Sequence, residues 1–154
     1  MELIPLLRKL KYKELELEFA QEVSELKAEV ESIAKEKGEE APSIESTPSN
    51  LLNLVAYSTR AAIMEAWLEV ESASVSVASS FWGQSPNDTF RNMPKLGEYL
   101  LQCKVIDEKQ LSVFNKLRQL RNKAAHAQDL DLSENDARSY VQLASDLARH
   151  IKGA

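Results

Sequence analysis

The sequence is poor in cysteine, histidine, glycine and proline, and each shortage excludes a class of structure. The single cysteine, Cys103, cannot form a disulfide within the chain, which favours a reducing compartment. Two histidines, His126 and His150, are too few for a histidine-rich metal site, and no cysteine–histidine spacing indicates zinc. Four glycines and five prolines in 154 residues favour long helices over many short strands.

Long apolar runs and an excess of positive charge are also missing. No stretch approaches the roughly 20 apolar residues that a membrane-spanning helix needs, and the first residues lack the basic and apolar segments of a signal peptide. The 24 acidic and 19 basic residues give a formal net charge of −5, which argues against bulk electrostatic binding of nucleic acid. We therefore expect a cytoplasmic protein without a metal or cofactor, and without DNA as a partner.

Apolar residues at helical spacing predict an all-α fold. Between residues 5 and 37 the chain is charged and lacks glycine. Five apolar residues recur there at spacings of 4, 3, 4 and 3, namely Phe19, Val23, Leu26, Val30 and Ile33. Such a seam is typical of a coiled coil or of a helix that packs along another. Lys37-Gly38 supplies a stop for this helix.

A second long helix is predicted from about residue 48 to 80, after a linker over residues 38–48. Thr47 is expected to cap this helix, with Pro48 at its first helical position. Its predicted buried face is a stripe of seven residues: Leu52, Ala56, Thr59, Ile63, Trp67, Val70 and Val77. We interpret Trp67 as a core residue rather than a platform for nucleic-acid bases.

Two further long helices and one short helix complete the predicted bundle. The short helix covers about residues 94 to 102. Asp107 and Gln110 have the spacing of a capping box, and the helix that they begin continues through His126. Ser133 and Asp136 form a second cap, and the last helix runs to about residue 152. We therefore predict a helical domain over 49–154, preceded by a helical arm over 1–37 and the linker over 38–48.

A polar motif lies near the end of the helix that contains His126. Arg118, Asn122 and His126 are four residues apart, so they form one slightly drifting stripe. Arg121 lies about 100° from Asn122 around the helix. We therefore expect Arg121, Asn122 and His126 to border one polar patch, which Arg118 extends. The segment 109–123 carries five basic residues and no acidic one: Lys109, Lys116, Arg118, Arg121 and Lys123.

The motif Arg121-Asn122-Lys-Ala-Ala-His126, placed near a helix end and followed by a loop and a final helix, resembles the signature of the HEPN superfamily. That signature is an Arg, often followed by a polar residue, and a His four to six residues further on. The segment Ser58-Thr-Arg-Ala-Ala-Ile-Met-Glu-Ala-Trp-Leu-Glu-Val-Glu71 is similar to the second helix of a HEPN-like family of uncharacterised bacterial domains. The resemblance covers roughly residues 48 to 152 and implies a HEPN-like helical bundle.

Many HEPN proteins are metal-independent ribonucleases, and they usually dimerise with two motifs facing one cleft. The resemblance therefore implies a homodimer that acts on RNA, in a toxin or phage-defence setting. His126 would be the general acid or base, Arg121 would bind the scissile phosphate, and Asn122 would orient the imidazole or the phosphate. Three further cations are predicted to contact RNA: Lys116, Arg118 and Lys123.

Several alternatives stay open at this point. Many HEPN-like domains are not catalytic, so the chain is equally consistent with an oligomerisation or ligand-binding module. The 19–33 seam either joins two protomers or packs back on the domain. Residues 3–13 are apolar and basic and precede an acidic stretch, so they also resemble a juxtamembrane segment on the cytoplasmic side of a membrane. Glu65, Glu69 and Glu71 are expected on a solvated face or in a salt bridge to Arg60.

Overall fold

The computed structural model describes residues 3–38, 47–82, 95–126 and 131–153. Within these ranges the chain forms six helices and no strand, which confirms the predicted all-α class. The helices are α1 (Leu3–Lys37), α2 (Ser49–Tyr57), α3 (Thr59–Trp82), α5 (Leu96–Gln102), α6 (Glu108–His126) and α7 (Glu134–Lys152). None of the helices described here has the combination of length and apolar character that crossing a bilayer requires.

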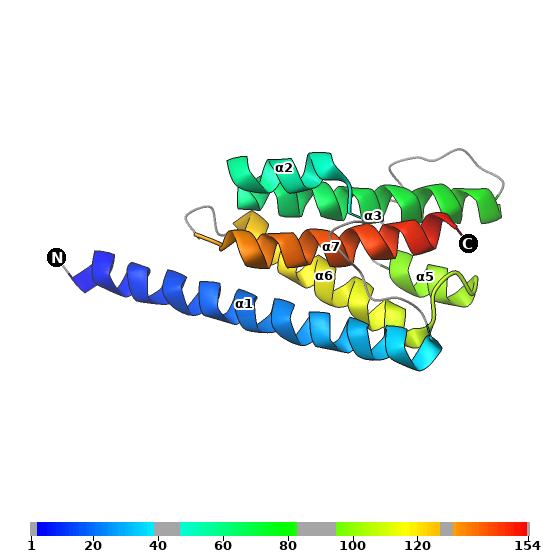
Figure 1. The fold of residues 1–154 in the computed structure, drawn as a ribbon, viewed down its shortest axis with the longest axis horizontal. Coiled ribbons are helices and arrows are strands. Elements are labelled where there is room, and N and C mark those ends of the chain that lie inside the picture. Colours follow the sequence, from blue (N-terminus) through cyan, green and yellow to red (C-terminus); the bar gives the residue numbers. More distant parts are fainter. Residues whose placement is uncertain (1–2, 39–46, 83–94, 127–130, 154) are drawn as a thin grey trace.

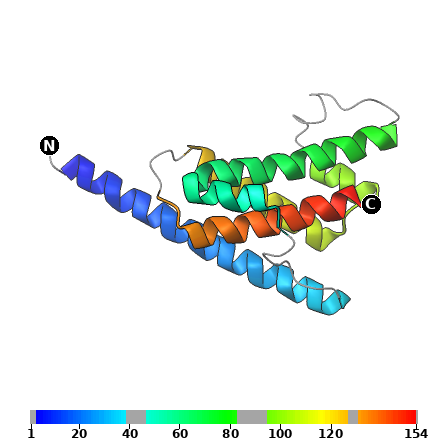
Figure 2. The ribbon, with the colours of Figure 1, turned by 45° about the horizontal axis from the view of Figure 1, so that its top comes forward.

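The helices form a bundle around α3 and α7, which pack along each other (Figure 1). α2 lies against both of them, and α5 packs on α3 and α6. α1 runs along α6 and α7 on the other side of the bundle, and its N-terminal end extends beyond the other helices (Figures 1 and 2). Two helices far apart in the sequence, α1 and α6, are therefore neighbours.

Three aromatic residues, from α3, α6 and α7, pack in the core. Trp67 of α3 is only 5% exposed, and its ring meets Phe114 of α6 edge to face, with the centroids 5.2 Å apart. Tyr140 of α7 is fully buried and donates a hydrogen bond from its hydroxyl to the Leu117 carbonyl at 2.8 Å. The interpretation of Trp67 as a core residue is confirmed.

The seam of α1 packs against the rest of the same chain. Phe19, Val23 and Leu26 are buried in the main core, and Val30 and Ile33 pack against that core while half-buried. The structure thus places this seam on α6 and α7 of its own chain. The domain boundaries stay predictions, and residues 39–46 of the expected linker lie outside the described residues.

Three helix ends lie where short sequence signals predicted them. α1 ends at Lys37, and Gly38 follows with a φ of +69°, the left-handed conformation that glycine adopts without strain. α6 begins after Asp107, and α7 begins after Ser133, whose hydroxyl accepts a hydrogen bond from the Asp136 amide at 3.1 Å. These caps satisfy backbone groups that a helix end would otherwise leave unpaired.

The prediction of a single helix over residues 48–80 is wrong, because the helix is interrupted at Ser58. This residue is extended, with φ −159° and ψ 111°, and its amide bonds to the Leu54 carbonyl at the end of α2. Its hydroxyl accepts a hydrogen bond from the Ala61 amide at 3.1 Å and so caps α3. A serine side chain that competes for backbone groups ends one helix and starts the next.

The break also changes which residues α2 buries. Leu51 and Val55 are buried, whereas Leu52 is half-buried and Ala56 is exposed, so the start of the predicted stripe is wrong. The expected Thr47 cap is wrong as well. Pro48 occupies the N-cap position, and no side chain caps it. In the α3 part of the stripe Ile63, Trp67 and Val70 are buried as predicted, whereas Thr59 and Val77 are half-buried.

Candidate functional site

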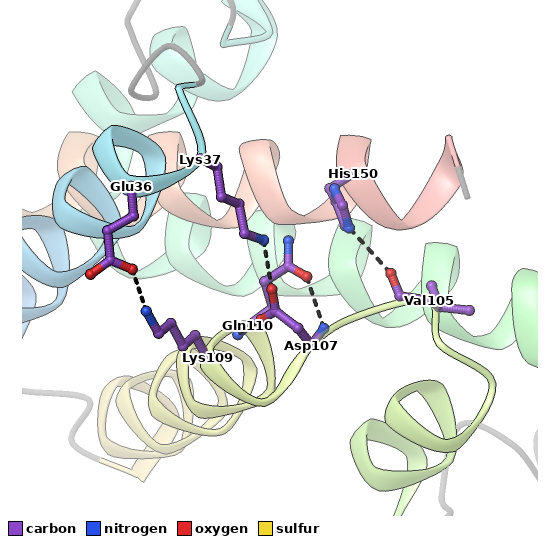
Figure 3. A network of polar contacts seen from close by, with 7 residues as sticks. All are labelled: Glu36, Lys37, Val105, Asp107, Lys109, Gln110 and His150. Carbon is purple, nitrogen blue, oxygen red and sulfur yellow. Dashed lines mark hydrogen bonds and ion pairs between the residues drawn. The ribbon is translucent and has the colours of Figure 1, made fainter.

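The start of α6 is closed by a reciprocal cap. The Gln110 amide donates to Asp107 Oδ1 at 2.8 Å, and the Asp107 amide donates to Gln110 Oε1 at 3.0 Å, which confirms the predicted capping box (Figure 3). The Lys37 ammonium at the end of α1 binds Asp107 Oδ2 at 2.6 Å. Burial acts to raise the pKa of Asp107, but the hydrogen bonds from Lys37 and Gln110 outweigh it, so this pKa lies below its usual value of 3.8.

The end of α6 is held by Arg60 of α3. Its Nε donates to the Ala124 carbonyl at 3.0 Å and its Nη2 donates to the Ala125 carbonyl at 3.0 Å. The last carbonyls of a helix lack partners and carry the negative end of its dipole, so a guanidinium suits them. Arg60 therefore binds another helix, and Glu65 and Glu69 are exposed, as the solvated-face alternative expected. No local sequence pattern predicts this contact, because its partners lie 64 and 65 residues away.

The three residues of the polar motif lie on the last turns of α6 but do not share one environment. His126 is exposed at the last residue of the helix. Arg121 is half-buried: its Nη1 donates to Asn122 Oδ1 at 3.1 Å, and its buried Nε has no hydrogen-bond partner among the described residues. Arg121 and His126 are five positions apart in the sequence, so their side chains point about 140° apart around the helix.

Arg121 is close enough to Tyr140 of α7 for its charge to act on the buried hydroxyl. Burial raises the pKa of the Tyr140 hydroxyl, and the positive charge of Arg121 offsets part of that rise, as a nearby guanidinium does. Asn122 is exposed like His126, and the two lie four residues apart on one face. The structure thus brings Arg121 together with Asn122 and leaves the imidazole of His126 open to solvent.

The lysines predicted to contact RNA are bound by carboxylates of α1. Lys123 Nζ lies 2.6 Å from Glu22 and 3.3 Å from Glu18, and Lys116 Nζ lies 2.5 Å from Glu29. Burial acts to lower the pKa of Lys123, but these two glutamates outweigh it and raise that pKa above 10.5. Arg118, the third predicted cation, is half-buried, and its Nη2 lies 3.5 Å from Asn115 Oδ1.

The ion pairs between α1 and α6 follow a seven-residue period on both helices. We call the following three pairs the charge ladder: Glu22–Lys123, Glu29–Lys116 and Glu36–Lys109. From one pair to the next, the residue number rises along α1 and falls along α6, so the two helices run antiparallel. Seven residues bring a coiled-coil position back to the same face. The period is visible in the sequence, and it is the signal that would have predicted this contact.

Two clefts lie beside the start of α6. One, of about 330 Å³, has an apolar floor that includes Val30 of α1 and Leu143 of α7. The other, of about 740 Å³, extends from Val105 to the end of α7. Three polar residues line both clefts: Gln110, Arg149 and His150. The Nε2 atom of His150 lies 3.1 Å from the Val105 carbonyl (Figure 3).

The motif residues line neither of these clefts, which lie near the opposite end of α6. Within the described ranges, no three histidine, cysteine, aspartate or glutamate side chains are grouped so as to hold a metal ion. Comparison with protein-family models, with curated proteins and with solved structures finds no match to this chain.

Proposed function

We propose that the chain is a HEPN-like helical domain that cleaves RNA as a metal-independent endoribonuclease and works as a homodimer. The observation that supports this most directly is the exposed imidazole of His126 at a helix end that Arg60 holds in place. An imidazole changes its charge near neutral pH, so it can take up and return a proton during one reaction. The family resemblance supplies the substrate class.

The chemistry requires no protein nucleophile. The imidazole of His126 takes the proton of the ribose 2′-OH, whose oxygen then attacks the adjacent phosphorus. The bond from phosphorus to the 5′-oxygen breaks, and that oxygen receives a proton from an imidazolium, which leaves a 2′,3′-cyclic phosphate. The family resemblance assigns Arg121 to the phosphoryl oxygens, where a guanidinium would stabilise the added charge, although within this chain it points about 140° away from His126. Asn122 accepts a hydrogen bond from Arg121 and so limits the rotation of its guanidinium.

A comparison of the chain's two histidines tests this proposal. RNA is incubated in EDTA with wild type, His126→Ala and His150→Ala, and the product ends are analysed. His150 is the matched control, because it too is exposed in the last turn of a helix. We expect His126→Ala to lose at least about 100-fold in rate, as removal of a general acid–base group does, and His150→Ala to stay near wild type. No cleavage by wild type, or equal cleavage by the first two proteins, rejects the proposal.

A different observation favours the alternative, a non-catalytic ligand-binding module. The clefts near the start of α6 combine an apolar floor with Arg149, His150 and Gln110, the composition that small-molecule sites favour. For this function, truncation within the clefts alters ligand-induced thermal stabilisation, whereas His126→Ala does not. A screen of small organic anions with Leu143→Ala and His126→Ala separates the two functions.

A further inference from the structure

Glutamates of α1 pair with lysines of α6 at regularly spaced positions. The charge ladder joins three positions on each helix, and Glu18 adds a second carboxylate at Lys123. The segment that continues from α6 is contacted as well, because Glu16 accepts a hydrogen bond from the Asp131 amide at 2.8 Å. Carboxylates thus follow α6 from its first turn to the residues after its last one.

The ladder flanks an apolar seam, as the charges of a coiled coil do. On α1 the buried seam residues are Phe19, Val23 and Leu26, and on α6 Val113 and Leu120 line clefts together with Val30 and Leu26 of α1. Glu22 and Glu29 directly precede Val23 and Val30 of the seam, so they occupy one repeating flank position. Charges at such positions select the partner and its direction, whereas the seam supplies most of the binding.

The ladder pairs are open to water. The side chains of Lys116 and Glu29 are 49% and 32% exposed, and those of Lys123 and Glu22 are 33% and 36% exposed. Ion pairs at such positions are weak and screened by salt, so another polyanion competes for these lysines at little cost. A phosphate makes the same kind of charge-assisted contact to an ammonium as a carboxylate does.

We propose that α1 is an acidic strap that occupies the RNA-binding lysines of α6, so that RNA phosphates and the α1 carboxylates compete for Lys116 and Lys123. This inference rests on the proposed RNA-directed function, because RNA is the polyanion that it invokes. It explains how an acidic chain holds a cationic helix face: the strap neutralises that face within the chain until RNA displaces the carboxylates. Binding is then tighter when the strap carries less charge.

The test removes the strap's charge without removing the strap. In the variant Glu18→Gln/Glu22→Gln/Glu29→Gln the side chains keep their size, and the apolar seam is unchanged. The control variant carries the same change in net charge at three exposed glutamates outside the charge ladder: Glu14, Glu31 and Glu65. The probe is a fluorescein-labelled 20-nucleotide oligouridine, titrated by fluorescence anisotropy over a range of salt concentrations. Circular dichroism and thermal melts verify that each variant folds.

We expect the strap variant to bind the oligouridine more tightly than the control variant does. Its plot of log affinity against log salt is steeper by about 1.4, since each lysine freed for a phosphate adds about 0.7 for a single strand. Equal affinities in the two variants mean that net charge alone acts, and they overturn the strap. Absence of binding by all proteins overturns it as well.

A second pair of measurements separates the strap from the cleavage reaction. If the strap variant binds more tightly but cleavage is absent or independent of His126, the ribonuclease proposal fails and the strap stands. The charge-swapped variant Glu22→Lys/Glu29→Lys/Lys116→Glu/Lys123→Glu restores pairing with reversed signs. We expect its α1 amides to keep wild-type protection from hydrogen exchange, whereas Glu22→Lys/Glu29→Lys alone loses that protection. Equal protection in these two variants contradicts the pairing on which the strap depends.

Discussion

The two ends of α6 hold their polar side chains in different ways. At the first turn, Asp107 and Gln110 cap each other across three residues, and Lys37 of α1 adds an ion pair. At the last turn, the carbonyls depend on Arg60 from a different helix, and His126 beyond them is exposed. One end is closed by its own sequence, whereas the other is closed by the tertiary fold. The end that carries the polar motif is thus the one whose order depends on long-range contacts.

The largest expected effect on the free energy of unfolding comes from a substitution in the middle of α6, between its two ends. Phe114 is 1% exposed and meets Trp67 edge to face. A Cβ atom added to Gly97 would lie 2.9 Å from its ring, which shows how closely α5 packs there. We expect Phe114→Ala to lower the free energy of unfolding by about 3–5 kcal/mol, because truncation of a buried aromatic leaves a cavity. Urea unfolding measures this loss.

Phe81→Ala is the matched control for that substitution, because Phe81 is 58% exposed. We expect it to change the free energy of unfolding by no more than about 0.5 kcal/mol. Hydrogen exchange on Phe114→Ala then shows whether the two ends of α6 open together. A loss from Phe81→Ala as large as that from Phe114→Ala would contradict the burial on which this prediction depends.

The next effect concerns the C-terminal end alone. Arg60→Ala removes two charge-assisted hydrogen bonds to half-buried carbonyls, and we expect a loss of about 1–3 kcal/mol. The amides of residues 122–126 are expected to exchange faster, while those at the start of α6 keep their protection. Arg60→Lys is the control, because it keeps the positive charge near the helix end but lacks the guanidinium N–H groups that bond to two carbonyls at once. Uniformly faster exchange along α6 would argue against a local cap.

The N-terminal end responds to acid and to loss of the cap. Asp107→Ala is expected to cost about 1 kcal/mol, the usual value of an N-cap, while Asp107→Asn keeps the cap and loses only the ion pair to Lys37. The pKa of Asp107 is lowered in the folded state, so its ionic contribution is present above pH 3.8 and is lost as the pH falls through the lowered value. Urea unfolding of wild type and Asp107→Asn between pH 2 and 7 should show their difference shrinking below about pH 4. A difference that grows in acid would have the wrong sign.

These contrasts explain which features the sequence could predict. Lys37-Gly38, Asp107 with Gln110, and Ser133 with Asp136 act within a few residues, so their pattern suffices to locate helix ends. The break at Ser58 escaped prediction because its serine lies in an otherwise regular apolar stripe. The role of Arg60 escaped it because no local pattern identifies a carbonyl on another helix.

In the candidate site, too, the features set by neighbouring residues could be predicted, whereas those set by contacts between helices could not. The motif's position at the end of α6 follows from the helix prediction, since α6 does end at His126. The partial burial of Arg121 and the effect of its charge on Tyr140 depend on how α6 packs against α7, and neither was foreseen. The glutamates of α1 and the lysines of α6 each repeat every seven residues, yet only the packed pair of helices shows that they face each other.

The smallest expected effects separate the two ends of the charge ladder. Lys109 is the most exposed of the three lysines in the charge ladder, with its side chain 56% exposed. Its hydrogen bond to Glu36 raises its pKa above 10.5. We expect Lys109→Gln to leave the unfolding midpoint unchanged within error, because water and salt screen so exposed a pair. Lys123→Gln, which removes a less exposed ammonium bound by two glutamates, is expected to lower the melting temperature by about 1–3 °C at low salt. Melts in 20 mM and 500 mM salt measure both variants, and the Lys123 effect should diminish at high salt. Equal shifts from the two substitutions would mean that the ladder stabilises both ends of α6 alike, and that the difference between those ends lies in Arg60 and the capping box alone.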